Sequence, residues 1–522
     1  MDLNLIERVG EWNPQMFREF KGQLKPRNIL VTVFGSLACQ FILVGVSTES
    51  FIGPNNNLEW EIRWQGLWQI LNWMLPALLL VGGVYMIIND LAKEERRGTL
   101  NFVRLSPESS QSILSGKALG VPILLYLAIA LALPLHCISG LVAGSSWAAI
   151  ADVPLLYTLW GAACCLFYSA AILITLLGAS QGNNQALAPA GSSLALMLGL
   201  PYISFLSFIF ESPDWKYVVV GSNWFFLPIG SIPLLGYVWT LCTFGAATYW
   251  VWQAINRRFR NPNATLISKK QSYLLVASFQ LWLVGFVLPG LSSGELDPRM
   301  SIGFAFLFAI NPVMFLVLIS ALSPGRQALQ DWTRYRKVES KNAKPKRNLS
   351  AVLGSSLVQD LIWAEKSPAV VAIAINLLIC AVIWIPWILL WPQHEWNASF
   401  TVSQAILSLL LTSNIILILS AICSLMMLIK TQKQNLYASV ALAAIFLPPL
   451  TLLSLSLRPE KIPFLWLFTA VPAIALQHAS MTTVFLGILG QWGIFTLLTL
   501  QLTRQMRRIG ASETKAILAG NR

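Results

Sequence analysis

The chain has 522 residues, of which 56% are hydrophobic and 11% are charged, with a formal net charge of +13. Soluble domains carry about 25% charged residues, so this composition argues strongly against a soluble globular protein. The apolar residues come in blocks of about 20, the length of helix that crosses a bilayer core. The sequence therefore predicts an all-α, polytopic integral membrane protein.

Twelve membrane-spanning helices are predicted, in two halves of roughly six spans each, with both termini in the cytoplasm. The predicted spans are 29–47, 67–89, 118–144, 153–179, 188–210, 228–255, 272–291, 300–323, 367–391, 403–429, 437–457 and 481–502. Two further apolar pieces, 222–233 and 464–480, are short and contain proline, so we expect them to be re-entrant or interfacial rather than spanning.

The first half of the chain is expected to comprise an interfacial helix within 1–28 and a membrane unit over 29–255, with a cytoplasmic loop at 90–117. A basic linker, 256–271, follows. The second half comprises a membrane region over 272–502, a cytoplasmic loop at 324–366 within that region, and a cytoplasmic tail at 503–522.

The basic residues orient these predicted spans. With a cytoplasmic N-terminus, 31 of the 36 Lys and Arg residues fall in cytoplasmic segments and five in outer ones. This is the asymmetry of the positive-inside rule, and it accounts for the net charge. No basic soluble face with readable motifs is present, so we expect no nucleic-acid partner. Anionic lipid headgroups are expected to contact the basic loops.

An amphipathic helix is predicted just before the first span. Asn13 is expected to cap it and Pro14 to occupy its first turn. Its apolar positions recur at three- and four-residue spacing: Met16, Phe17, Phe20 and Leu24. This pattern is typical of a helix that lies along the membrane interface, and a simple surface anchor has the same pattern.

The loop 90–117 is predicted to form a bent pair of helices. The second span is expected to continue as a helix to residue 104, with Glu94 paired to Arg97. Ser106–Pro107 should break it, because the residue before proline avoids the helical region. Ser106 is expected to cap the next helix with Pro107 at its first position.

A small apolar patch is predicted near this elbow, formed by Leu100, Val103 and Leu105. Gly98 would permit either a hinge or the close approach of another backbone. The segment could be a surface that another protein grips, or an ordinary solvated loop. Its physical chemistry alone favours neither.

Motifs for catalysis or ion coupling are absent from the sequence. No predicted span has a charged residue near its centre, which argues against proton-driven transport but leaves sodium coupling through carbonyl groups open. Gly116–Lys117 does not complete a Walker A motif. The seven cysteines lie in predicted spans without a CxxC pair, and the three histidines form no cluster, so no metal or cofactor is expected.

The loop 90–117 resembles the first intracellular loop of ABC-2 type transporter permeases. That loop carries acidic residues, then Gly-Thr-Leu, a hydrophobic residue, a small-Pro pair and a later Gly-Lys. The matching residues are Glu94, Glu95, Gly98, Thr99, Leu100, Leu105, Ser106, Pro107, Gly116 and Lys117. The segment 13–28 is similar to the family's connecting helix, with Asn13, Pro14, Phe17, Arg18, Glu19 and Phe20.

The resemblance covers about residues 12–255. It implies a multi-pass permease subunit of a bacterial plasma membrane, with no ATPase site of its own. The loop 90–117, called the knuckle below, would be a coupling helix that binds in a groove of a separate ATP-binding subunit. That partner would hold ATP and Mg²⁺. Export of a lipid, drug, peptide or polysaccharide would fit. A homodimer or a second permease would complete the transporter.

Residues 272–522 depart from the six-span pattern and are interpreted as a divergent second unit. Leu357 and Leu361 predict another interfacial helix before the span 367–391. The loop 430–439 would match the knuckle in position, although it lacks the Glu, Gly-Thr-Leu and Pro. Two alternatives remain for the whole chain: an ion-coupled secondary carrier, or a membrane-integral regulatory or enzymatic protein.

Overall fold

The computed structural model describes residues 10–52, 58–144, 148–178, 187–211, 223–288, 306–342, 356–390, 401–431 and 434–519. The chain divides into two compact units, which are held together by separate cores. The first unit comprises Met1–Gly221 with Ile229–Pro262, and the second comprises Ser222–Pro228 with Asn263–Arg522.

Helices dominate both units, and the described strands form one hairpin. The first unit contains α2 (Pro14–Gln23), α3 (Pro26–Val46), β1 (Thr48–Ile52), β2 (Leu58–Ile62), α4 (Trp64–Ala77), the π-helix η1 (Leu78–Gly82), α5 (Gly83–Arg96), α6 (Thr99–Arg104), α7 (Ser110–Gly120), α8 (Ile123–Gly144), α9 (Ala148–Gly178), α10 (Leu187–Glu211) and α12 (Pro233–Arg260). The strands β1 and β2 pair antiparallel, with Thr48 opposite Ile62.

The described secondary-structure elements of the second unit are also helices. It contains α13 (Lys269–Val287), the π-helix η4 (Phe306–Ile310), α15 (Asn311–Leu322), α16 (Arg326–Asn342), α18 (Ser356–Trp363), α19 (Val370–Leu389), α20 (Val402–Met426), α21 (Gln434–Ala443), the 3₁₀-helix η6 (Ala444–Phe446), α22 (Leu447–Ser454), α23 (Pro463–Trp466), α24 (Ala473–Leu476) and α25 (Met481–Ala519).

Eight described helices are long and apolar enough to cross a membrane, which makes this an all-α helical membrane protein. They are Pro26–Val46, Trp64–Arg96, Ile123–Ala143, Val153–Gly178, Val370–Leu389, Val402–Met426, Leu436–Ser454 and Met481–Ile509. A ninth results if Phe306–Leu322 and Arg326–Lys337, bent by 67°, count as one span. The eight helices and the Phe306–Leu322 part of the ninth coincide with predicted spans, whereas Arg326–Lys337 falls in the predicted cytoplasmic loop 324–366. Helices also occupy the other three predicted positions, as α10, α12 and α13, and the total of twelve spans stays a prediction.

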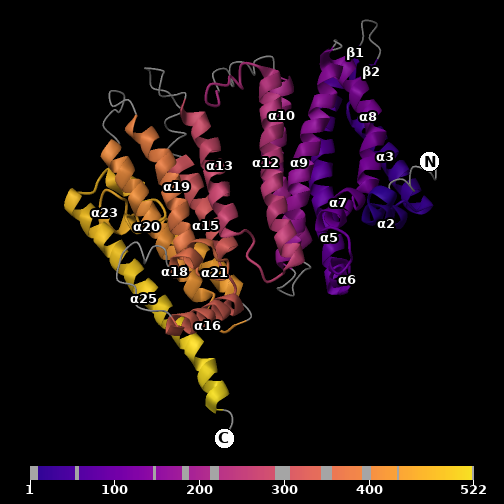
Figure 1. The fold of residues 1–522 in the computed structure, drawn as a ribbon. Helices are drawn as coiled ribbons and strands as arrows, with labels where there is room; N and C mark the ends of the chain where they lie inside the picture. Colours follow the sequence, from indigo (N-terminus) through magenta and orange to yellow (C-terminus); the bar gives the residue numbers. More distant parts are fainter. Residues whose placement is uncertain are drawn as a thin grey trace. The chain divides into compact units, whose positions relative to one another are not determined.

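The first unit packs its upright helices side by side, and α2 lies crosswise at the end where α7 begins (Figure 1). Its core is formed by fully buried leucine and isoleucine side chains of several helices, including Leu67, Ile87, Leu114 and Ile172. At the π turn between α4 and α5, the Tyr168 hydroxyl donates to the Leu79 carbonyl at 2.8 Å. This contact ties η1 to α9, and the following helix α5 carries acidic residues toward α7.

The loop 90–117 is bent, but its predicted helix boundaries are wrong at two points. The first helix ends at Arg96, and Gly98 adopts a left-handed conformation with φ +73° before α6 begins. The helix after the elbow is capped by Ser109, whose side chain accepts from the Ser112 amide, rather than by Ser106. Ser106–Pro107 do interrupt the helix, and an extended Ser109 then supplies the cap geometry.

Neither of the two ambiguous apolar pieces spans a membrane in the described residues. In the first, residues 223–232 form turns, and the Phe225 amide donates to the Gly285 carbonyl at 2.6 Å within the second unit. In the second, 464–480 contains only the end of α23 and the four-residue α24, with Trp466 and Leu467 buried in a small core. Neither piece contains a helix of spanning length among its described residues, as expected, and whether each is re-entrant or interfacial stays a prediction.

Candidate docking site at the elbow of the first unit

The crosswise helix α2 begins where the sequence predicts. The Asn13 side chain accepts from the Met16 amide at 2.9 Å, and Pro14 follows at the first helical position. Asn13 also donates to the Ser112 carbonyl of α7 at 2.8 Å. One side chain thus caps α2 and fastens its start to the helix that follows the elbow.

Two glycines let α2 and α7 come into direct contact. A Cβ on Gly116 would lie 2.5 Å from Asn13 Oδ1 and 2.8 Å from the Met16 amide nitrogen. A Cβ on Gly120 would lie 2.7 Å from Glu19 Cβ. Because real Cβ atoms do not approach other atoms so closely, any side chain at either position would push the two helices apart.

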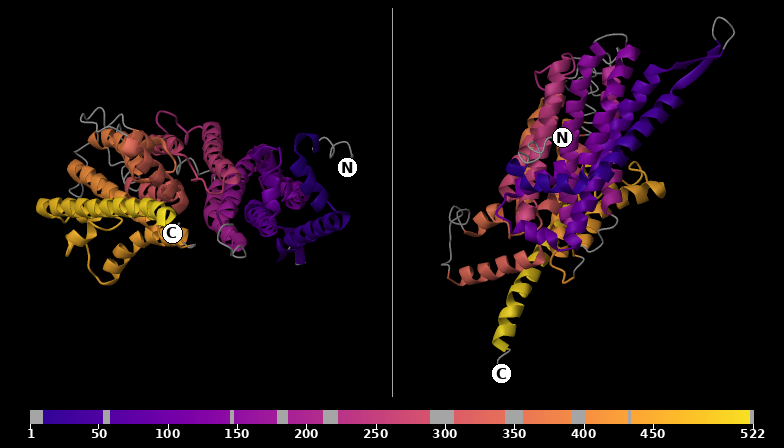
Figure 2. Two further views of the ribbon diagram at one scale, coloured as in Figure 1. Left: turned by 60° about the horizontal axis from the view of Figure 1, so that its bottom comes forward. Right: turned by 90° about the vertical axis from the view of Figure 1, so that its right-hand side faces the viewer.

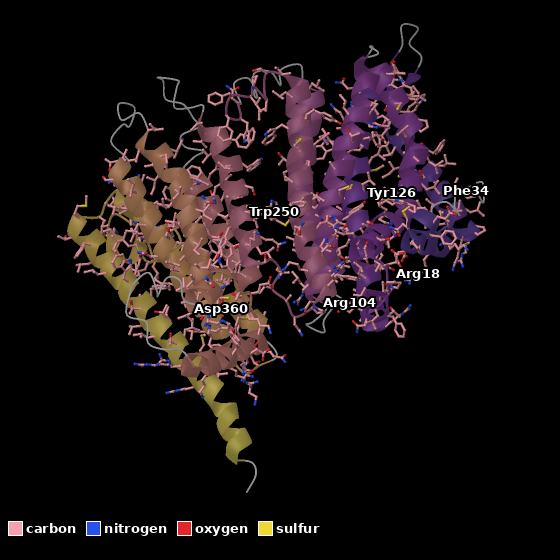
Figure 3. The ribbon with its side chains drawn as sticks, in the orientation of Figure 1. Arg18, Phe34, Arg104, Tyr126, Trp250 and Asp360 are labelled. Atoms are coloured by element: carbon pink, nitrogen blue, oxygen red, sulfur yellow. The ribbon has the colours of Figure 1, made fainter. Side chains whose placement is uncertain are left out.

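Lys117 lies at the centre of a buried ion cluster. Its side chain is fully buried, and Nζ lies 2.7 Å from Asp90 Oδ2, 3.0 Å from Glu94 Oε1 and 3.1 Å from Glu19 Oε1. These carboxylates come from α5 and α2, so three helices meet at one ammonium group. Arg18 extends the cluster, with Nη2 2.6 Å from Glu94 Oε1, and Figure 3 shows it at the junction of α2 with the upright helices.

The three carboxylates of this cluster could in principle hold a metal ion, because their oxygens lie within 4.8 Å of one another. The ammonium of Lys117 contacts all three and supplies the compensating charge. Burial lowers the pKa of Lys117, but Asp90, Glu19 and Glu94 outweigh burial, so the pKa is raised above its ordinary value. Lys117 is therefore charged at neutral pH. The predicted Glu94–Arg97 pair is wrong, since Glu94 contacts Lys117 and Arg18 instead.

The turn that leads into α6 accounts for the residue types at positions 98 and 99. Gly98 provides the positive φ, and no atom lies within 4 Å of where its Cβ would be, so its role is the turn and not a close approach of another backbone. Thr99 then begins α6, and its hydroxyl donates to the Glu94 carbonyl at 3.0 Å. Pro107 is exposed in the elbow itself.

The predicted apolar patch divides between two faces of α6. Leu100 is 1% exposed and belongs to the core, with Val103 half-buried beside that core. Leu105, by contrast, is 85% exposed, and Phe102 is 83% exposed. Placing Leu100 in the exposed tip was wrong, because the helical turn directs positions 100 and 103 inward and leaves 102 outside. The exposed tip consists of Phe102 and Leu105.

The other predicted site residues lie near the ion cluster or near the exposed tip. Glu95 interacts electrostatically with Arg104 and Arg258, and Arg104 lies 5.6 Å from the centre of the Phe259 ring. On α2, Phe17 is half-buried under Lys21, whose Nζ is 4.3 Å from the ring centre, and Phe20 is half-buried too. These contacts fix the orientations of α6 and α2 without adding to the ion cluster.

A cavity of about 360 Å³ opens beside the elbow, where α7 begins next to the end of α12. It is lined by Ser109, Ser110, Gln111, Gln253, Asn256, Arg257 and Arg260. Within it, the Ser110 hydroxyl donates to Asn256 Oδ1 at 3.1 Å. The exposed tip is therefore accompanied by a basic, hydrogen-bonding recess in the same unit.

Sequence reasoning did not find the ion cluster. Glu19 entered only through the resemblance, and Asp90 had no assigned role. Lys117 was named only as part of the Gly-Lys pair in that resemblance. A lysine at the entrance to a span is ordinarily assigned to topology. The sequence does contain one indication of the cluster. Lys117 lies between Gly116 and Gly120, and these glycines permit the close contact between α7 and α2.

The second unit also has a buried lysine, Lys269, but it does not lie in the loop 430–439, which was predicted to match 90–117. Lys269, at the start of α13, is 1% exposed. Its Nζ donates to the Leu361 carbonyl at 2.7 Å, the Ser367 hydroxyl at 2.6 Å and the Pro368 carbonyl at 3.3 Å. These contacts hold α18, the helix predicted from Leu357 and Leu361. The described part of 430–439 contains the beginning of α21.

No family model, curated protein or solved structure matches this chain. The features of the chain that bear on function are therefore the exposed tip of the elbow and the buried ion cluster behind it.

Proposed function

We propose that this chain is the permease subunit of an ABC-2-like transporter, and that a separate ATP-binding subunit docks on the knuckle 90–117. The partner would hydrolyse ATP with Mg²⁺, and this chain would move a substrate, in the export direction, across a bacterial plasma membrane. The observation that carries the proposal is an exposed apolar tip whose base is fixed by a buried ion cluster.

The tip has the properties of a protein-docking surface. Phe102 and Leu105 are almost fully exposed, and the same loop also exposes charged residues such as Lys93, Arg96 and Glu108. A large aromatic or aliphatic side chain that fills a partner's pocket is typical of the residues that dominate binding energy. The adjacent cavity with Arg257 and Arg260 would accept an acidic side chain of the same partner.

The base of the tip is suited to transmit force. Lys117 joins α7 to α5 and α2, and Asn13 joins α2 to α7. A displacement of α6 would therefore move the interfacial helix and the ends of two membrane helices together. A solvated loop would need neither a buried lysine nor close glycine contacts, so these features favour the docking interpretation over a plain loop.

The proposal is tested by co-expression with a candidate ATP-binding-cassette subunit. We expect the purified chain to have no ATPase activity alone and to retain the subunit through purification. Phe102→Asp with Leu105→Asp should reduce the retained subunit at least about tenfold, because each side chain fully buried in an interface contributes about 1.5–3 kcal/mol. Leu100 is unsuitable for this test because it lies in the core.

Trp12→Asp is the matched control, since Trp12 is 69% exposed near the start of α2 and lies outside the knuckle. It should leave the retained subunit unchanged. Full retention in the Phe102/Leu105 double variant would reject the knuckle as the docking element. Substrate uptake that follows a sodium or proton gradient in vesicles without ATPase would favour a secondary carrier instead.

A further inference from the structure

The second unit contains a larger polar cavity that the proposed transport cycle does not use. It has a volume of about 610 Å³ and lies between the first turns of α16, the turn that follows α20 and the start of α21. Its lining residues are Arg326, Gln327, Gln330, Asp331, Arg334, Lys430, Thr431 and Gln434. Figure 2 shows α16 lying crosswise in this unit, next to the long helix α25.

The cavity is built to receive an anion. Three of its lining residues are cations, and its one carboxylate, Asp331, has Oδ2 3.7 Å from Nζ of Lys366 outside the lining set. The Nε–H of Arg326 is buried and has no acceptor among the described residues. A buried guanidinium donor without an acceptor is costly, and a bound oxyanion would supply one.

Lining residues of the cavity follow closely after the ends of two apolar helices, α15 and α20. Arg326 follows the 67° bend after α15, four residues beyond its last residue, Leu322. Lys430 likewise follows Met426, the last residue of α20, by four residues. Both helices are apolar to their ends. Headgroups occupy a layer only about 5–8 Å thick on each side of the hydrocarbon core, so residues just past two membrane helices fall within it.

We propose that this cavity binds the phosphate of an anionic phospholipid headgroup from the cytoplasmic leaflet. Guanidinium groups match phosphate oxygens in paired hydrogen bonds, and the glutamine and threonine side chains add donors for the rest of the headgroup. Such a lipid would join α16 to the turn between α20 and α21, two segments that are far apart in the sequence.

The test measures lipid binding to the purified full-length chain by native mass spectrometry. Phosphatidylglycerol is titrated against phosphatidylcholine after delipidation. The cavity variant is Arg326→Gln with Arg334→Gln and Lys430→Gln. We expect it to bind phosphatidylglycerol at least about tenfold more weakly than the native chain, because it loses the charge-assisted hydrogen bonds that these three cations would donate to the phosphate.

The matched control removes the same charge from α25, as Arg504→Gln with Arg507→Gln and Arg508→Gln, three exposed residues that do not line the cavity. Its phosphatidylglycerol binding should stay within about twofold of the native value. Equal losses in both triple variants, or no preference over phosphatidylcholine in the native chain, would overturn the proposal.

Two further measurements keep the result unambiguous. Unchanged phosphatidylcholine binding establishes that the cavity variant is folded. If the triple variant does not fold, the single variant Lys430→Gln takes its place, because the Lys430 side chain is exposed. Pyrophosphate supplied alone tests a soluble source of the same chemistry. If pyrophosphate raises the melting temperature of the native chain only, and phosphatidylglycerol shows no selectivity, the ligand is a soluble phosphate compound and the lipid assignment fails.

Discussion

At the scale of single residues, the buried charges around Lys117 make the loss of this lysine destabilising. Taking an ammonium group and three carboxylates out of water is costly, and the cost is offset only while the opposite charges stay in contact. Removing the lysine would leave Asp90 without its cation, and Glu19 and Glu94 with only the exposed Arg18 as a counter-charge among the described residues. Replacing Lys117 should therefore destabilise the fold, whatever the net contribution of the intact cluster to stability.

We expect Lys117→Met to destabilise the first unit by about 3–5 kcal/mol, the usual cost of breaking a buried ion pair. Thermal unfolding of the purified chain in detergent should show a melting temperature lowered by several degrees. Lys93→Met is the control, because Lys93 is exposed on α5. Similar melting temperatures for the two variants would mean that the cluster does not hold the elbow.

At the scale of elements, the sequence predicts helix starts better than helix partners. Asn13 and Pro14 form a local cap, and the structure confirms it. The break at Ser106–Pro107 is likewise local, but three later serines could each have capped the next helix, and Ser109 does so. The contact between Lys117 and Glu19 joins residues 98 positions apart, which no local periodicity encodes.

Gly116→Ala tests the contact between α2 and α7. The added methyl group would lie 2.8 Å from the Met16 backbone nitrogen, which cannot move without shifting α2. We expect a loss of about 1–3 kcal/mol, as for overpacking in a core. Gly161→Ala in α9 is the opposite case, because no atom lies within 4 Å of its Cβ position, so it should be neutral or slightly stabilising. Equal melting temperatures for the two variants would contradict the close contact.

At the scale of the whole molecule, each unit fastens a short helix, α2 or α18, to a buried lysine, but the lysines have different surroundings. Carboxylates surround Lys117 in the first unit, whereas a hydroxyl and two carbonyls surround Lys269 in the second. Burial lowers the pKa of Lys269 to about 8, and Asp360 opposes this only in part. The two fastenings should therefore respond to pH in different ways.

The direction of each response follows from linkage between protonation and folding. Lys117 has a raised pKa, so its stabilisation is fully present below the unfolded value of about 10.4 and is lost only at higher pH. Lys269 has a lowered pKa. Between about 8 and 10.4 the opened state binds more protons than the closed state, so closure around Lys269 becomes more favourable as pH rises through this window.

Hydrogen exchange of the full-length chain, corrected for the intrinsic chemical rate, can follow both helices in one sample. Between pH 7 and 9.5 we expect protection of α18 to rise by about 2 kcal/mol while that of α2 stays constant. Lys269→Met should abolish the rise, and Lys270→Met, at an exposed neighbour, should retain it. If α18 responds equally in both variants, Lys269 does not control the closure. If α2 responds together with α18, the two units do not open independently.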